Sequence, residues 1–190
     1  MQMTQETREG ERRRPRGSVL WMTGLPASGK STLAQLTGEI LRNEYGCAVE
    51  ILDGDEIRKG ISRDLGLSRE DREEHAHRVS YVAKLLARNG VVAIVALISP
   101  YRTSRAQARS VISPERFVEI YVKAPLAVCE KRDPKGLYAK ARRGEIDNMT
   151  GIQHPYEEPL NPDLVVDTSS ATPEQSAREL IAGLHRLELL

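Results

Sequence analysis

Hydrophobic runs alternate with helical patterns along most of the chain. Short runs rich in β-branched residues predict strands over residues 18–22, 49–52, 91–97, 117–122 and 164–166. Helices are predicted over residues 30–45, 69–89, 104–111, 126–132 and 173–189. Strands that are apolar throughout are typical of a parallel sheet covered on both faces. The pattern therefore predicts a three-layer α/β/α fold around a five-stranded parallel sheet.

Two of the predicted helices begin with capping signals. Thr172, Pro173 and Gln175 form the pattern of a capping box with proline in the first turn. Ser68 and Asp71 offer a similar start for the helix that begins at residue 69.

Residues 133–163 interrupt this alternation. The stretch combines turn formers with basic side chains: Pro134, Gly136, Gly144, Gly151, Pro155, Pro159 and Pro162 with Lys135, Lys140, Arg142 and Arg143. A long, turn-rich segment inside a compact domain is typical of a functional loop. We predict a lid here, and an irregular surface excursion is the alternative.

Length and charge limit the organisation and the partners of the chain. The 190 residues suit one domain over residues 18–190, preceded by a flexible basic arm at residues 1–17. Two interpretations of residues 1–17 are open: a solvated tail, or a segment that binds an anionic partner. A formal net charge of +1 predicts no general attraction to nucleic acid or to a membrane.

Other features of the chain predict a cytoplasmic protein. The N-terminus does not have the pattern of a secretory signal, and the longest apolar run, residues 91–98, is too short to span a bilayer. Cys47 and Cys129 lack the spacing of a zinc site or a disulfide framework.

A glycine-rich segment supplies the first candidate chemistry. The residues that form it are Gly24, Leu25, Pro26, Ala27, Ser28, Gly29, Lys30 and Ser31, followed by Thr32. They match the phosphate-binding P-loop pattern GxxxxGK[ST], directly after a predicted strand and at the start of a predicted helix. Backbone amides and the helix dipole favour phosphate there. We expect Lys30 to reach the β- and γ-phosphates of ATP and Ser31 to ligate Mg²⁺.

Two carboxylates follow the second predicted strand. Asp53 and Asp55 come where a parallel strand ends, which is the edge at which such folds bind ligands. Asp55 is predicted to act near Mg²⁺ or to accept the proton of an attacking hydroxyl. The alternative is a turn in which Asp53 caps a following helix.

Arginines cluster after these carboxylates and again beyond the third predicted strand. Phosphoryl transfer to an anionic acceptor needs guanidinium groups that hold the acceptor against the charge of ATP. Arg58, Arg72 and Arg102 are the candidates. The chain has no NKxD segment of the kind with which GTPases bind guanine, and it is short for a motor ATPase. The sequence therefore favours a small-molecule kinase of the P-loop class.

Several longer motifs resemble the adenylyl-sulfate (APS) kinase family over about residues 18–168. They are the segments 21–25, 52–58, 64–72, 98–102, 132–138, 151–157 and 161–162. The resemblance implies ATP-dependent phosphorylation of the 3′-hydroxyl of adenosine 5′-phosphosulfate, with Mg²⁺ as cofactor and a homodimer as the candidate assembly.

The resemblance also implies roles for individual residues. Asp55 would lie near Mg²⁺ and the acceptor hydroxyl, Arg58 and Arg72 would hold the phosphosulfate, and Ser99 would position the acceptor. The remaining acceptor-side candidates are Asp53, Leu67, His75, Pro100, Tyr101, Arg102, Lys135, Gly136, Leu137 and Met149. Arg132 and Thr172 join the phosphate loop on the ATP side, and the loop 169–172 would border adenine.

The sequence departs from the family pattern at the acceptor base. Leu67 and Met149 stand where family members usually carry two phenylalanines that sandwich the adenine, and His75 and His77 replace an asparagine and an arginine. Stacking of a base on an aromatic ring is worth roughly 1–3 kcal/mol. His75 is predicted either to point at the acceptor or to be a solvated helix residue.

Three functions therefore remain open at this point: APS kinase with an aliphatic base clamp, the same transfer to another nucleotide-linked anion such as a cytidine diphosphoramidate, and a non-catalytic ATP-binding regulatory domain.

Overall fold

A computed structural model describes residues 17–190 of the chain, and its centre is a five-stranded parallel sheet. The strands are β1 (Ser18–Thr23), β2 (Val49–Asp53), β3 (Val92–Ala96), β4 (Arg116–Lys123) and β5 (Leu164–Asp167). Their order in the sheet is β2-β3-β1-β4-β5, and every neighbouring pair is parallel. The predicted α/β/α architecture is confirmed. The predicted arm falls almost wholly on residues 1–16, which lie outside the described residues.

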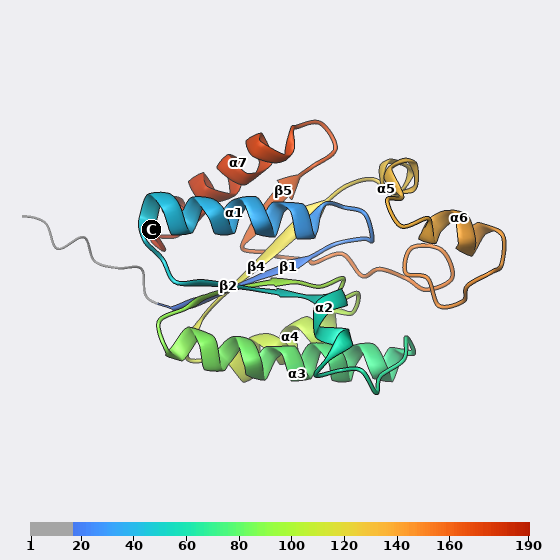
Figure 1. Ribbon diagram of the computed structural model, residues 1–190, viewed down its shortest axis with the longest axis horizontal. Coiled ribbons are helices and arrows are strands. Elements are labelled where there is room, and N and C mark those ends of the chain that lie inside the picture. Colours follow the sequence, from blue (N-terminus) through green and yellow to red (C-terminus); the bar gives the residue numbers. More distant parts are fainter. Residues whose placement is uncertain (1–16) are drawn as a thin grey trace, which may run out of the picture.

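Helices cover both faces of the sheet, as Figure 1 shows. One face is covered by α1 (Lys30–Tyr45) and α7 (Pro173–Arg186), and the other by α3 (Arg69–Arg88) and α4 (Arg102–Ile112). All six residues of β1 are buried, because this central strand has helices on both sides. Alternate residues of β1 therefore enter different cores: Leu20 packs toward α1 and α7, and Trp21 toward α3 and α4.

The predicted caps and most helix ends are confirmed. Thr172 and Gln175 form the capping box of α7, and the Ser68 side chain accepts a hydrogen bond from the Asp71 amide at the start of α3. The predicted bounds of α1 and α5 (Leu126–Arg132) agree with the structure. The helix predicted over residues 104–111 begins earlier, at Arg102, and the last helix ends at Arg186.

Two short helices were not predicted from the periodic pattern, although the alternative reading of Asp53 as a helix cap anticipated the first of them. Helix α2 (Gly54–Lys59) follows β2 directly, and α6 (Leu137–Arg142) lies inside the predicted lid. Six residues give too few helical turns for a periodic signal, and both helices depend on a cap or on packing. The Asp53 side chain accepts a hydrogen bond from the Asp55 amide at the start of α2.

The region from α5 through α6 forms a third, small core of its own. Tyr138, Ala141 and Met149 pack there with Cys129, against side chains that include Leu25 of the phosphate loop. Figure 1 shows α5 and α6 beyond one end of the sheet. Within residues 17–190, no helix combines the length and the apolar character needed to cross a membrane.

Candidate active site

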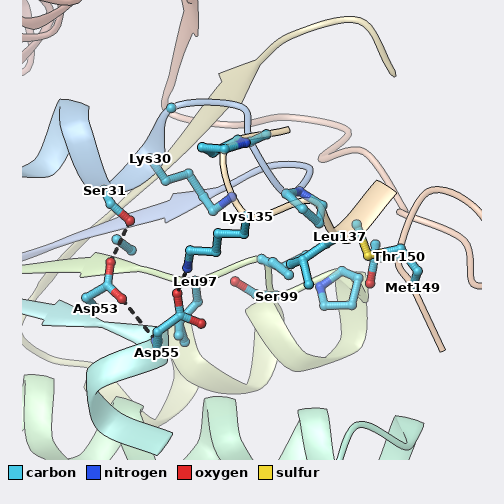
Figure 2. Close-up of a pocket in the computed structure, with 18 of the residues that line it drawn as sticks. Lys30, Ser31, Asp53, Asp55, Leu97, Ser99, Lys135, Leu137, Met149 and Thr150 are labelled. Atoms are coloured by element: carbon cyan, nitrogen blue, oxygen red, sulfur yellow. Dashed lines mark hydrogen bonds and ion pairs between the residues drawn. The ribbon is translucent and has the colours of Figure 1, made fainter. Parts of the chain in front are cut away.

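A single large cavity of about 910 Å³ lies where the phosphate loop, the ends of β2 and β3, the start of α3 and the lid segment meet. The carboxyl edge of a parallel sheet is where α/β folds bind ligands, and this volume suits two small-molecule substrates. Figure 2 shows that the labelled residues from these separate segments surround one space.

The phosphate loop forms one end of the cavity. Pro26, Ala27, Gly29, Lys30, Ser31 and Thr32 line it. Gly29 has a φ of 95°, a conformation that glycine adopts without strain. Gly24 lies deeper, and a Cβ on it would come 2.4 Å from the carbonyl oxygen of Val122, so only glycine fits. Leu25 and Ser28 also lie behind the lining, where Leu25 packs into the lid core.

Lys30 is the only buried lysine among the described residues. Its Nζ donates hydrogen bonds to the carbonyl oxygens of Gly24 at 3.0 Å and Leu25 at 2.8 Å. Burial lowers the pKa of Lys30 to about 8, although the nearby carboxylates of Asp53 and Asp55 oppose this shift. The third partner of Lys30 Nζ is the Ser28 hydroxyl at 3.5 Å. A buried cation bonded only to neutral oxygen atoms favours an anion beside it, as phosphate binding requires.

The two aspartates after β2 lie beside this loop. The Ser31 hydroxyl donates to Asp53 Oδ2 at 2.6 Å, and Asp53 Oδ1 accepts from the Asp55 amide. Asp53 therefore caps α2, as the alternative reading predicted, and also contacts the phosphate loop. Asp55 projects into the cavity, where its carboxylate pairs with Lys135 of the lid segment (Figure 2).

Arginines line the cavity away from the phosphate loop. Arg58 and Arg72 both reach it, and partial burial lowers the pKa of each guanidinium. Arg58 donates to the carbonyl of Gly66 at 2.9 Å, and Arg72 donates to Leu67 and Asn148 carbonyls at 2.9 and 2.7 Å. Backbone carbonyls hold both guanidiniums in place without neutralising their charge, so the charge is available for an anionic ligand.

His75 lies with these arginines, one helical turn after Arg72. Its side chain is 5% exposed, and neither ring nitrogen has a hydrogen-bond partner. The reading of His75 as a solvated helix residue is therefore wrong. Burial, together with the charges of Arg58, Arg78 and Arg72, lowers the pKa of His75 to about 4, although the Asp55 carboxylate opposes the shift. His77 points elsewhere, toward Gln107 and Tyr81.

The two positions that replace the phenylalanine pair both line the cavity. Leu67 is 49% exposed at its edge, whereas Met149 is 6% exposed and packs into the lid core. Ser99, Pro100 and Leu137 complete the acceptor-side lining that the sequence predicted. Ser99 is a non-glycine residue with a φ of 36°.

Besides Gly24, Leu25 and Ser28 of the phosphate loop, four predicted site residues are not part of the cavity lining: Tyr101, Arg102, Gly136 and Thr172. Tyr101 is buried beneath the guanidinium of Arg69, and Arg102 donates to the carbonyl of Glu158 at 2.8 Å. Thr172 caps α7, while its neighbours Ala171 and Pro173 do line the cavity. This structure thus shows no direct ligand-facing position for these four residues.

Other residues at the site have partners in distant segments, which the sequence could not reveal. The Tyr138 hydroxyl donates to the Pro26 carbonyl at 3.0 Å, joining the lid to the phosphate loop. Arg132, predicted on the ATP side, donates to the hydroxyl of Thr168 at 3.1 Å and also to its carbonyl oxygen. Asp133 caps α6 through the amides of Tyr138 and Ala139.

Comparison with known proteins connects this geometry to one family. The model of the adenylylsulphate kinase family matches residues 16–167, which is most of the chain. The chain belongs to the adenylylsulphate kinase family. An adenylyl-sulfate kinase of Halothermothrix orenii is 51% identical over 172 residues, covering 90% of this chain and 91% of the relative.

Solved structures of this family share the fold. A Mycobacterium tuberculosis APS kinase, determined in complex with AMPPNP and APS, is 46% identical with a TM-score of 0.86, covering 90% of this chain and 99% of that one. A hexameric APS kinase from Thiobacillus denitrificans is 30% identical with a TM-score of 0.72, covering 94% of this chain and 30% of that one.

Proposed function

We propose that the chain transfers the γ-phosphoryl group of ATP to the 3′-hydroxyl of adenosine 5′-phosphosulfate and releases ADP and 3′-phosphoadenosine 5′-phosphosulfate. The observation that carries this proposal is the shared cavity: a phosphate loop with buried Lys30 at one end and Arg58 with Arg72 at the other. Asp55 projects between these two groups of cations. Membership of the adenylylsulphate kinase family supports the same acceptor.

The chain's own residues then have distinct roles in the transfer. The acceptor oxygen forms a bond to the γ-phosphorus while the bond from that phosphorus to the β–γ bridging oxygen breaks. Lys30 neutralises charge on the phosphates, and Asp55 takes the proton that the acceptor hydroxyl loses. In this scheme the Lys135 ammonium group moves away from the Asp55 carboxylate before the transfer, because a carboxylate paired with an ammonium group is a weaker base.

The arginines hold the acceptor in line with ATP. A phosphosulfate carries negative charge next to the triphosphate, and without cations the two substrates would repel each other. Arg58 and Arg72 supply fixed guanidinium groups for it, since carbonyl oxygens already restrict their orientation.

The oxygen groups near the phosphate loop fit a magnesium ion. The Ser31 hydroxyl and the Asp53 carboxylate lie 2.6 Å apart, with Asp55 on the same side of the cavity, and hydroxyl and carboxylate oxygens suit a hard cation. Within residues 17–190, no group of three or more His, Cys, Asp or Glu residues could hold a metal. In the proposed site the phosphates supply further oxygen ligands, so Ser31 and Asp55, with Asp53 beside them, would hold Mg²⁺ together with the phosphates. Bound Mg²⁺ would neutralise phosphate charge.

The lid segment and the loop before α7 would enclose the substrates. Pro134, Lys135 and Leu137 approach the cavity from the lid, and Ala171 and Pro173 line it on the ATP side. We expect closure to exclude water, which would otherwise compete with the acceptor.

A different nucleotide acceptor is the second candidate, and the base-clamp positions favour it. Leu67 and Met149 are aliphatic, so the site lacks a pair of aromatic rings that would select a purine by stacking. A cytidine diphosphoramidate would retain the anionic group that Arg58 and Arg72 bind.

A panel of acceptors tests the proposal. Purified protein with Mg-ATP would be given APS, AMP, a cytidine diphosphoramidate or no acceptor, and ADP release and product mass would be measured. We expect APS to give the highest kcat/KM. A higher kcat/KM with the cytidine compound would replace the first candidate by the second.

The assembly and the cellular location remain predictions. We propose that the chain self-associates as a homodimer in the cytoplasm, and the hexameric relative makes larger assemblies worth measuring. Light scattering on the purified chain tests the assembly.

A further inference from the structure

Ser99 is held in the acceptor half of the cavity by partners from two separate segments, β1 and α4. Its side chain is 6% exposed, and Figure 2 shows it on the cavity wall between Asp55 and Met149. The Ser99 hydroxyl oxygen accepts a hydrogen bond from the Trp21 indole Nε1 at 3.0 Å. The Ser99 carbonyl accepts one from the Arg105 guanidinium at 2.7 Å. Trp21 and Arg105 are 0% and 3% exposed, so water does not compete for either bond.

The sheet register explains why Trp21 and Arg105 act at the same place. Trp21 of β1 pairs with Glu119 of β4, so these two side chains stand next to each other on the face covered by α3 and α4. Glu119 accepts from Arg105 Nε at 2.7 Å, which orients the guanidinium toward Ser99. The indole from β1 and the guanidinium from α4, which Glu119 on the adjacent strand β4 orients, therefore reach the same loop.

Arg105 also ties Ser99 to the segment that returns from the lid. The Nη2 atom of Arg105 donates to the Glu157 carbonyl at 2.7 Å, and the Glu157 amide donates to the Pro100 carbonyl at 2.8 Å. Thr23, on β1, donates to the Ile98 carbonyl at 2.8 Å. The backbone on both sides of Ser99 is thus bonded, which holds this residue at its positive φ of 36°.

We infer that Trp21 and Arg105 are positioning residues that fix Ser99 as a hydrogen-bond donor to the acceptor nucleotide. A serine hydroxyl has one donor and two acceptor sites. Because the indole N–H occupies one acceptor site, the hydroxyl proton is directed to another partner, and among the described residues no protein acceptor is bonded to it. The open partner is an oxygen or nitrogen atom of the bound acceptor. This inference rests on the proposed function.

The same contact disfavours Ser99 as the group that takes the phosphoryl from ATP. A nucleophilic hydroxyl needs a base within hydrogen-bond reach to take its proton. The only hydrogen bond to the Ser99 side chain within residues 17–190 comes from the Trp21 N–H, which is a donor and not a base. Its role is therefore to position the acceptor for direct transfer.

Trp21→Phe is the first variant to test, because it keeps an aromatic ring in the core and removes the N–H donor. We expect kcat/KM for APS to fall about tenfold, as expected for loss of one hydrogen bond, while KM for ATP changes little. The melting temperature should also fall, because phenylalanine is smaller than the buried indole, so the kinetic difference between APS and ATP is the informative measurement. Phe117→Leu is the matched control: its ring packs on Trp21 at 5.8 Å between centroids but does not touch Ser99. That variant should lower the melting temperature and leave KM for APS unchanged.

A double-mutant cycle separates positioning from general stability. If Trp21 acts through Ser99, Trp21→Phe adds no further loss to the Ser99→Ala variant. Independent, additive losses in kcat/KM for APS would overturn the inference, and so would wild-type kinetics in Trp21→Phe. Arg105→Lys keeps a cation beside Glu119 but not three hydrogen bonds, so it should also raise KM for APS more than KM for ATP.

A spectroscopic test covers the case in which a variant fails to fold or APS is not the substrate. The chain has a single tryptophan, so its indole N–H gives one unambiguous NMR signal. We expect Ser99→Ala to move this signal in the protein without ligands. An unmoved indole signal would refute the hydrogen bond itself. If the wild-type chain releases no ADP with APS, the proposed function fails while this test still reports on the contact.

Discussion

The ammonium group of Lys135 is paired with the Oδ2 atom of Asp55, so a lid residue contacts the carboxylate predicted to serve the acceptor hydroxyl. Both side chains are more than half exposed, at 61% and 64%. An exposed pair of this kind contributes little to stability. Its importance is that it joins the predicted lid to the predicted catalytic carboxylate, and the proposed transfer requires the two groups to separate.

The first prediction concerns Lys30. Lys30→Ala should lower kcat by at least about a hundredfold, because in the proposed reaction the phosphates lose the one lysine that is buried among residues 17–190. Circular dichroism should show that the fold survives. Lys131→Ala, at an exposed position outside the cavity lining, is the matched control and should keep wild-type kinetics. Wild-type turnover in Lys30→Ala would refute the phosphate-loop assignment.

Asp55→Asn tests the carboxylate. The amide keeps the size of the side chain but neither takes a proton nor pairs with Lys135, so kcat should fall about a hundredfold or more. The dissociation constant of ATP should change only modestly, and isothermal titration measures it. Glu56→Gln, on the next residue of α2 and outside the large cavity, is the control. An unchanged kcat in Asp55→Asn would remove Asp55 from the chemistry.

The base-clamp positions predict a change in acceptor affinity. Leu67→Phe and Met149→Phe together should lower KM for APS, because stacking of an aromatic ring on a base contributes roughly 1–3 kcal/mol to binding. The two positions differ in burial, at 49% and 6% exposed. Met149→Phe alone is therefore expected to lower the melting temperature by overpacking the lid core. If KM for APS stays constant in the double variant, these side chains do not cover the base.

The burial of His75 predicts that the stability of the folded chain depends on pH. Its pKa lies at about 4 in the folded chain, below the ordinary value of 6.5, so the unfolded chain binds the proton more readily. The free energy of unfolding should fall as the pH drops from about 6.5 to about 4, by at most about 1.4 kcal/mol per pH unit.

Urea unfolding at pH 7.5, 6 and 5 measures the His75 effect. The groups that face His75 are Arg58 and Asp55 on α2 and Arg72 and Arg78 on α3. His75→Asn should remove part of the loss between pH 6.5 and 4, whereas His77→Asn should not. Equal slopes in wild type and His75→Asn would show that folding does not lower the pKa of His75.

The sequence by itself determined the local elements and the chemistry that each one carries. Continuous apolar strands such as Ser18–Thr23 predict a buried parallel sheet, because a strand covered on both faces has no polar side. The spacing of Gly24, Gly29, Lys30 and Ser31 predicts a phosphate loop, because the turn and the helix start that bind phosphate are formed by consecutive residues. Asp53 was predictable as a helix cap for the same reason.

Only the tertiary structure decided which side chains share the cavity. His75 could be solvated or buried on the evidence of its helix, and its position against Gly54 and the arginines buries it. Arg102 and Arg72 look alike in sequence, yet long-range contacts turn Arg102 toward Glu158 and Arg72 toward Asn148. The sequence identifies Trp21 only as a core residue, whereas the register of β1 places its N–H beside Ser99, 78 positions away. Contacts across such separations depend on how whole elements pack, and no local pattern encodes them.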